Sequence, residues 1–88
     1  MDTRSKSPVS EKASRDLASS QLKLLSNRER QVLKQVVEGQ SNVEIGRKLR
    51  LSPKTVATYR SRMMQKLGIA NLPGLVKFAI VAGITPLL

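Results

Sequence analysis

The sequence predicts an all-α fold, a four-helix bundle preceded by a poorly ordered N-terminal tail. Apolar residues recur every three or four positions in four segments after residue 21, which is the period of an amphipathic helix. Each segment begins at a residue that can cap a helix, and Gly39, Gly68 and Gly83 follow three of them. The chain of 88 residues allows one small domain with a modest core.

Residues 1–21 are rich in Ser, Lys, Arg, Asp and Glu, and their few apolar residues are mostly small. Such a segment buries too little apolar surface to offset the entropy lost on ordering. We therefore predict a flexible linker or tail over 1–21, with at most a transient helix over about 10–18, and an ordered domain over 22–88.

The first two predicted helices begin with the same local pattern. Ser26 precedes Glu29 by three residues and Ser41 precedes Glu44 by three, which is the spacing of a capping box. The first helix carries its apolar side chains on one face and ends before Gly39. The second is short and has Gly46 in its interior, where glycine costs about 1 kcal/mol relative to alanine. We expect another helix to approach closely at that glycine.

The third predicted helix covers about 53–67 and has two different faces. Ser52 can cap it, Pro53 suits its first position, and Gly68 suits the residue after its end. One stripe is apolar, with the stem of Arg60 among Val56, Met63 and Leu67. Another face carries polar and basic side chains: Lys54, Thr58, Ser61 and Gln65, flanked by Ala57 and Arg62. Two short helices joined by a tight turn form a helix-turn-helix, whose second helix enters the major groove of DNA.

The fourth predicted helix begins after Asn71 and runs to about Ala82, and it is apolar nearly all round. A helix of this kind must be covered on a second side. Self-association is the simplest cover, through a stripe of Pro73, Lys77, Ile80 and Ile84. The alternative is that Ile84, Leu87 and Leu88 fold back over it within one chain.

The charge distribution favours a polyanionic partner. The formal net charge is +10, and no acidic residue follows Glu44. A block of one sign points to nucleic acid ahead of an anionic membrane. The start of the predicted second helix, with Asn42, is a candidate contact for a phosphate.

Composition argues against several other classes of protein. The chain has no histidine and no cysteine, so the commonest general base, the commonest metal ligand and thiolate sites are absent. We expect no enzyme activity, no metal and no cofactor. The sequence shows no signal peptide and no apolar run of the ~20 residues that a membrane span requires. We expect a cytoplasmic protein.

Several blocks, in order and at their spacing, resemble the LuxR/NarL-type (GerE-like) helix-turn-helix domain. The blocks are LSNRERQVL (25–33), Gly39, SNVEIG (41–46), LSPKTV (51–56) and KLGI (66–69), and the resemblance covers about 24–84. Within that family, residues 58–67 look most like the output domains of two-component response regulators.

The resemblance implies that the third helix reads double-stranded DNA and that the fourth forms a homodimer on paired half-sites. Carried over by position, the base contacts are Lys54, Ala57, Thr58, Ser61 and Arg62, and the backbone contacts are Thr55, Tyr59 and Lys66. On this assignment, removing Lys66 weakens binding to all sequences alike.

The sequence departs from the family pattern at three positions. Ala57 stands where many members have Lys, Tyr59 replaces the usual His, and Gly46 replaces the usual Ala. Most members also carry an upstream regulatory domain, usually a phosphorylatable receiver. Because the residues before Leu22 are too few for a receiver, we expect an isolated output domain with its linker or a short stand-alone member.

Two other interpretations stay open at this point. A basic helical interaction module could dock on another protein, with RNA polymerase as a candidate, through its apolar last helix. Non-specific binding of RNA or DNA is the second. The chain has only Tyr59 and Phe78 as aromatics, which argues against single-stranded RNA because its readers rely on stacking.

Overall fold

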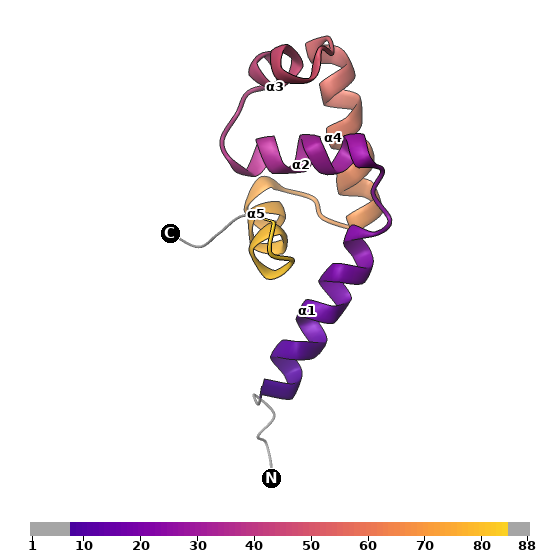
Figure 1. Cartoon of the computed structure of the whole chain (residues 1–88), viewed down its shortest axis with the longest axis vertical. Coiled ribbons are helices and arrows are strands. Elements are labelled where there is room, and N and C mark those ends of the chain that lie inside the picture. Colours follow the sequence, from indigo (N-terminus) through magenta and orange to yellow (C-terminus); the bar gives the residue numbers. More distant parts are fainter. Residues whose placement is uncertain (1–7, 85–88) are drawn as a thin grey trace.

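The structure, a computed structural model, describes residues 8–84 and confirms the all-α fold. Its helices are α1 (Pro8–Leu22), α2 (Asn27–Val37), α3 (Asn42–Leu49), α4 (Pro53–Leu67) and α5 (Leu72–Val81). Helix α2 crosses α4, α3 lies above α2 beside the start of α4, and α5 lies below α2 (Figure 1). The helix-turn-helix is the α3–α4 pair.

The helix starts are fixed by short-range hydrogen bonds, as the sequence predicts. In both capping boxes the serine hydroxyl accepts a bond from the backbone N–H three residues on, and the glutamate accepts one in return. Ser26 N and Ser41 N each lie 2.8 Å from Oε1 of their glutamates. Asn71 caps α5 by accepting from Gly74 N at 2.8 Å. Each helix from α2 to α5 therefore carries its own side-chain cap.

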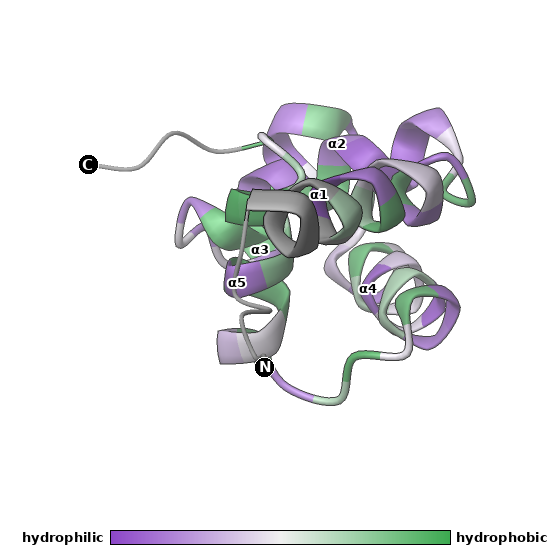
Figure 2. Cartoon of the chain, turned by 90° about the horizontal axis from the view of Figure 1, so that it is seen from below, coloured by the Kyte–Doolittle hydropathy of each residue, from purple (hydrophilic) through white to green (hydrophobic). Residues whose placement is uncertain are grey.

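The core lies where α2 and α3 pack against α4 and where α5 packs against α2. In Figure 2 the ribbons of α2 and α4 alternate between hydrophilic and hydrophobic colours along their turns, as amphipathic helices do. The buried cluster consists of Leu25, Val32, Leu33, Val36, Ile45, Val56, Met63, Leu67 and Leu75. This core holds the inner face of α4 and leaves its other face to solvent.

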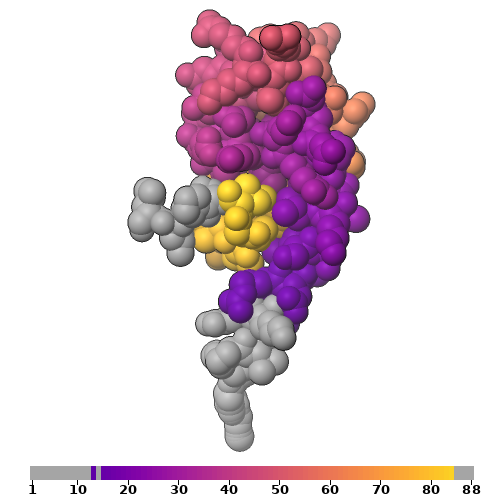
Figure 3. All heavy atoms as spheres, in the orientation of Figure 1, coloured from indigo at the N-terminus to yellow at the C-terminus, as the bar shows by residue number. Residues whose placement is uncertain are grey.

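Helix α1 occupies most of the segment expected to be a poorly ordered tail, so the described chain has five helices rather than four. Ala18 is buried, and Leu22 packs against the core cluster. Atoms of α1 and α5 lie side by side in Figure 3. The helix depends on these tertiary contacts, because its own residues are mostly polar. Residues 1–7 lie outside the described part.

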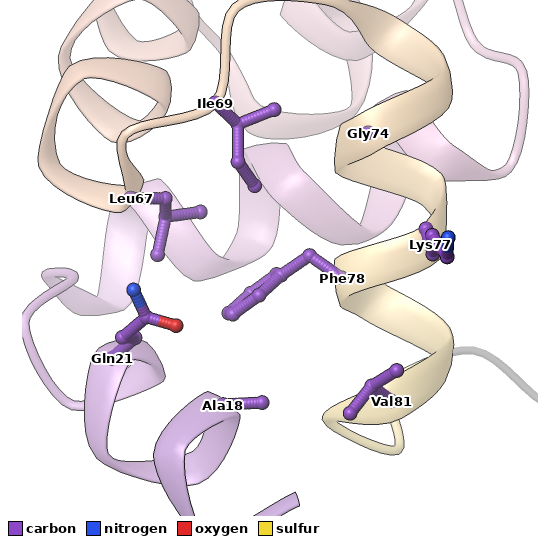
Figure 4. A pocket seen from close by; sticks show the side chains of 8 residues that line it. All are labelled: Ala18, Gln21, Leu67, Ile69, Gly74, Lys77, Phe78 and Val81. Atoms are coloured by element: carbon purple, nitrogen blue, oxygen red, sulfur yellow. The ribbon is translucent and has the colours of Figure 1, made fainter. Parts of the chain in front are cut away.

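Helix α1 covers part of the second side of α5. Self-association and folding back of the C-terminal residues were the two sequence-based alternatives, and neither included this contact. Phe78 projects from α5 toward Ala18 and Gln21 of α1 (Figure 4). Between the helices lies an open, mainly apolar pocket of about 320 Å³. Ile84, which both alternatives included, packs against the core cluster, and Leu87 and Leu88 lie outside the described residues.

The close approach expected at Gly46 is present, but the neighbour is the turn before α4 and not another helix. A Cβ at Gly46 would collide with the backbone carbonyl oxygen of Leu51, whose N–H donates to Gly46 O at 2.8 Å. Arg50 is the C-terminal cap residue of α3 and has a left-handed backbone conformation, with φ 60° and ψ 46°. The turn thus folds directly onto α3, which fixes where α4 begins.

Candidate nucleic-acid interface

The start of α4 is held by a compact set of hydrogen bonds. Ser52 Oγ accepts from Thr55 N at 3.1 Å and lies 2.9 Å from Thr55 Oγ1, to which it can donate. Pro53 occupies the first turn, where its lack of an N–H leaves no bond unmade. Thr55, predicted to contact the DNA backbone, therefore lies at the capped, partly exposed end of α4.

The five predicted base-contacting residues share one side of α4. Four of them are exposed (Lys54, Thr58, Ser61 and Arg62), and Ala57 is half-buried among them. Val56 and Met63 are fully buried on the opposite side, so the helix cannot turn without exposing its apolar stripe. The structure therefore brings the predicted set together on a surface that a ligand can reach.

Thr58 has a local partner that shapes what its side chain can offer. Its hydroxyl donates to the carbonyl oxygen of Lys54 at 3.2 Å, one turn earlier in the helix. A hydroxyl has one hydrogen to donate, so its oxygen remains available only as an acceptor. Thr58 can thus accept from an amino group at a base edge, or place its methyl group against that of a thymine.

The predicted backbone contacts are spread over different parts of the helix-turn-helix. Asn42 begins α3 and is half-buried, with its Oδ1 accepting from Arg60 Nη1 at 2.8 Å. Tyr59 is half-buried and packs against the core cluster. Lys66 lies in the last turn of α4, at the end opposite Thr55. Their contacts with DNA stay a prediction.

The ammonium group of Lys66 is engaged within the protein. Its Nζ lies 2.8 Å from Oε1 of Glu29, whose side chain is only 4% exposed, whereas the Lys66 side chain is 43% exposed. Burial, the largest single influence, raises the pKa of the Glu29 carboxyl, but the hydrogen bonds from Lys66 and Ser26 together hold it below its ordinary value. Lys66 thus stabilises a buried carboxylate, a role that the sequence-based assignment did not include.

Other cross-helix contacts were also missed by sequence reasoning. Arg28 donates to the carbonyl oxygen of Leu49 at 3.4 Å, and Lys48 donates to Gln35 at 3.2 Å. Both bonds tie α2 to α3, and their partners are 21 and 13 positions apart. No local sequence pattern marks such pairs, because they depend on how the helices cross.

The predicted dimer stripe is only partly on the surface. Pro73, Lys77 and Ile80 are exposed, and Ile80 is one of the larger exposed hydrophobic residues. Ile84 is half-buried and packs against the core. Three of the four residues are therefore accessible to a second copy of the chain.

The part of the chain that the structure describes has no cluster of metal ligands and no membrane-spanning helix. Over the described part of the chain, no group of three or more acidic, histidine or cysteine residues could hold a metal ion. None of the helices there has both the length and the apolar character needed to cross a membrane.

A family model decides the assignment. The model of bacterial regulatory proteins of the LuxR family matches residues 23–79, which include α2, α3, α4 and most of α5. The chain belongs to the LuxR family. The resemblance seen in the sequence motifs is thereby confirmed, and a member of this regulatory family is not an enzyme.

Curated relatives of this LuxR-family chain include transcriptional regulatory proteins. The transcriptional regulatory protein FixJ of Azorhizobium caulinodans is 48% identical over 62 residues, covering 70% of this chain and 29% of FixJ. UhpA of Escherichia coli K12 is 46% identical over 55 residues, covering 62% of this chain and 28% of UhpA. The chain thus spans less than a third of the length of these relatives.

A solved structure agrees with the family assignment. Full-length FixJ from B. japonicum superposes with a TM-score of 0.83 at 33% sequence identity. The match covers 90% of this LuxR-family chain and 39% of that FixJ chain. The all-α arrangement around α4 is therefore shared with a known regulator.

Proposed function

We propose that this chain is the output domain of a bacterial transcription regulator and binds double-stranded DNA sequence-specifically through α4. The observation that carries the proposal is the exposed face of α4, where basic and hydroxyl side chains stand opposite a buried stripe. A major groove admits one α-helix, and its base edges offer donors and acceptors that such side chains can match. The names of the relatives, transcriptional regulatory proteins among them, support this function.

The first step of binding is electrostatic. The net charge of +10 attracts the chain to any duplex, and each phosphate that is neutralised releases counterions. Asn42, Thr55 and Tyr59 then act near the DNA backbone and set the register of α4. Lys66 can contribute charge there as well, since its side chain is 43% exposed while its ammonium remains paired with Glu29. A cytoplasmic location belongs to the same proposal, because the operator lies there.

The second step is discrimination between base pairs by α4. Lys54 can donate to guanine, and Ala57 offers a methyl group to thymine. Thr58 contributes an acceptor and Ser61 a hydroxyl, and Arg62 extends the set toward the end of the helix. Each well-formed contact of this kind is worth about 1–3 kcal/mol against the wrong base.

Two copies of the chain would meet two half-sites about one helical turn apart, through α5. The exposed Pro73, Lys77 and Ile80 supply the surface for that contact. Such pairing can be confined to the DNA-bound state, because the operator holds both copies at high local concentration.

The test is selection and sequencing of bound duplexes from a random pool at two salt concentrations. A motif that persists at the higher salt supports specific readout, and its repeat gives the half-site spacing. A Ser61→Ala variant is expected to change preference at a defined position of that motif while keeping the rest. Binding that enriches no sequence and collapses with salt would leave only the electrostatic attraction and contradict the proposal.

A further inference from the structure

Arg60 belongs to α4 but is turned toward α3. It is half-buried, and its Nη1 donates to Oδ1 of Asn42 at 2.8 Å, across 18 positions of sequence. Asn42 is the first residue of α3, immediately after the cap Ser41. The bond therefore joins the middle of α4 to the beginning of the helix that precedes it.

The chemistry of the two groups fixes the orientation of the Asn42 amide. A guanidinium group can only donate hydrogen bonds, so it must face the oxygen of the amide and not the nitrogen. The two N–H donors on Nδ2 then point to the other side of the planar group. Among the hydrogen bonds between described residues, none uses these two donors.

We propose that Arg60 is a positioning residue, which holds the Asn42 amide so that its Nδ2 donors face a DNA phosphate. The inference rests on the proposed function, since it assumes that the start of α3 meets the DNA backbone. Without Arg60 the amide could rotate by half a turn and present its oxygen, which a phosphate repels. Arg60 thus acts on DNA through Asn42, although it lies on the helix that reads the bases.

The position of Arg60 explains why it is separate from the base-contacting set. Arg60 follows Val56 by four residues and precedes Met63 by three, so it lies on the inward side of α4. Thr58 and Ser61 lie on the exposed side. Loss of Arg60 should therefore weaken binding without changing which bases are preferred.

The test uses a duplex that carries the selected motif, with single phosphates replaced in turn by uncharged methylphosphonates. For the unmodified protein, we expect one position per half-site where the replacement lowers affinity about tenfold, as for a hydrogen bond to a charged group. In Asn42→Ala that position should lose its effect. In Arg60→Ala the same methylphosphonate replacement should lower the affinity by about threefold or less, because the Asn42 amide is no longer held in place.

Asn42→Asp separates positioning from folding. Its carboxylate keeps Arg60 as a partner but has no N–H to donate, and it repels phosphate. We expect the thermal stability of Asn42→Asp to be unchanged or higher, and its affinity for DNA to fall by about tenfold or more. Arg60→Lys, which keeps a donor and a charge, should restore part of the sensitivity that Arg60→Ala loses.

The outcomes distinguish this inference from the proposed function. If the pool selection yields a motif but Asn42→Ala and Arg60→Ala keep the full methylphosphonate profile, the positioning role is overturned and specific binding stands. If Arg60→Ala changes the selected motif itself, Arg60 reads bases and the inference is again wrong. If no motif is selected, the proposed function fails, and this inference fails with it.

Discussion

Oε1 of Glu29 lies 2.8 Å from Nζ of Lys66 and joins the first turn of α2 to the last turn of α4. The same oxygen accepts from Ser26 N, so one buried atom both caps α2 and pairs with α4. A buried carboxylate that loses its partner is costly, because water cannot replace the lost bond.

Lys66→Met should therefore destabilise the fold as well as change DNA binding. We expect a loss of about 1–2 kcal/mol, which is less than the roughly 3–5 kcal/mol for breaking a fully buried pair, because Lys66 is partly exposed. Chemical denaturation measures it, with Lys34→Met, an exposed lysine on α2, as the matched control. Equal stability of the two variants would contradict a structural role for Lys66.

The Glu29–Lys66 pair also predicts how stability depends on pH. The pKa of Glu29 is lowered from its ordinary value of 4.5, so the folded state holds the carboxylate better than the unfolded chain does. The resulting stabilisation is present above about pH 4.5 and is lost as the pH falls through the lowered pKa. Thermal unfolding of the unmodified protein and of Glu29→Gln should converge in acid. A constant difference between their melting temperatures from neutral to acid pH would contradict this.

Gly46→Ala should destabilise the domain, although alanine is the better helix former. The gain in helix propensity is about 1 kcal/mol, while the new Cβ would meet the Leu51 carbonyl, and overpacking costs about 1–3 kcal/mol. Because the obstacle is backbone, the turn must shift, and we expect a net loss. Arg47→Ala, on the exposed side of α3, is the control for helix propensity. Urea denaturation compares the free energies of unfolding of the two variants. A more stable Gly46→Ala would mean that the turn moves freely.

The docking of α1 can be tested with two neighbouring residues. Ala18 is 4% exposed and Leu17 is 61% exposed. Ala18→Glu places a charge against the apolar surface of α5 and should lower stability by about 1–3 kcal/mol. Leu17→Glu should leave it within about 0.5 kcal/mol. Both are read from thermal unfolding by circular dichroism, and equal effects would show that α1 does not dock as described.

Ile80→Asp should interfere with pairing of two copies on DNA while leaving each copy folded. Ile80 is 36% exposed, so the charge stays in water in a single copy but is buried in an α5 contact. On a duplex with two half-sites we expect cooperativity to fall, with single half-site affinity unchanged. Gel-shift titration on both duplexes measures this, and Leu24→Asp, on an exposed residue outside α5, is the control. Intact cooperativity would place the pairing surface elsewhere.

The features that the sequence predicted correctly are local. A capping box needs only a serine and a glutamate three residues apart, and Ser26–Glu29 and Ser41–Glu44 both form it. The amphipathic pattern of α4 likewise determines which face is buried, and the exposed set around Thr58 follows from it. Such features are specified within one or two helical turns.

The features that it missed depend on how separate helices meet. Glu29 and Lys66 are 37 positions apart, and nothing near Glu29 indicates a second partner beyond its cap. The stable packing of α1 was not predicted, because its composition is mostly polar and Ala18 becomes buried only where α1 meets α4 and α5. The base and backbone contacts remain predictions, since they require DNA to test them.

The separate caps of α2 to α5 have a consequence for the speed of folding. Because each of these helices is started by residues within three positions of its cap, its first turn can form without help from the rest of the chain. Small helical proteins rich in such local contacts fold in microseconds to milliseconds. The slow event is then the search for the crossing of α2 and α4, and the Glu29–Lys66 pair can close only after that crossing is found.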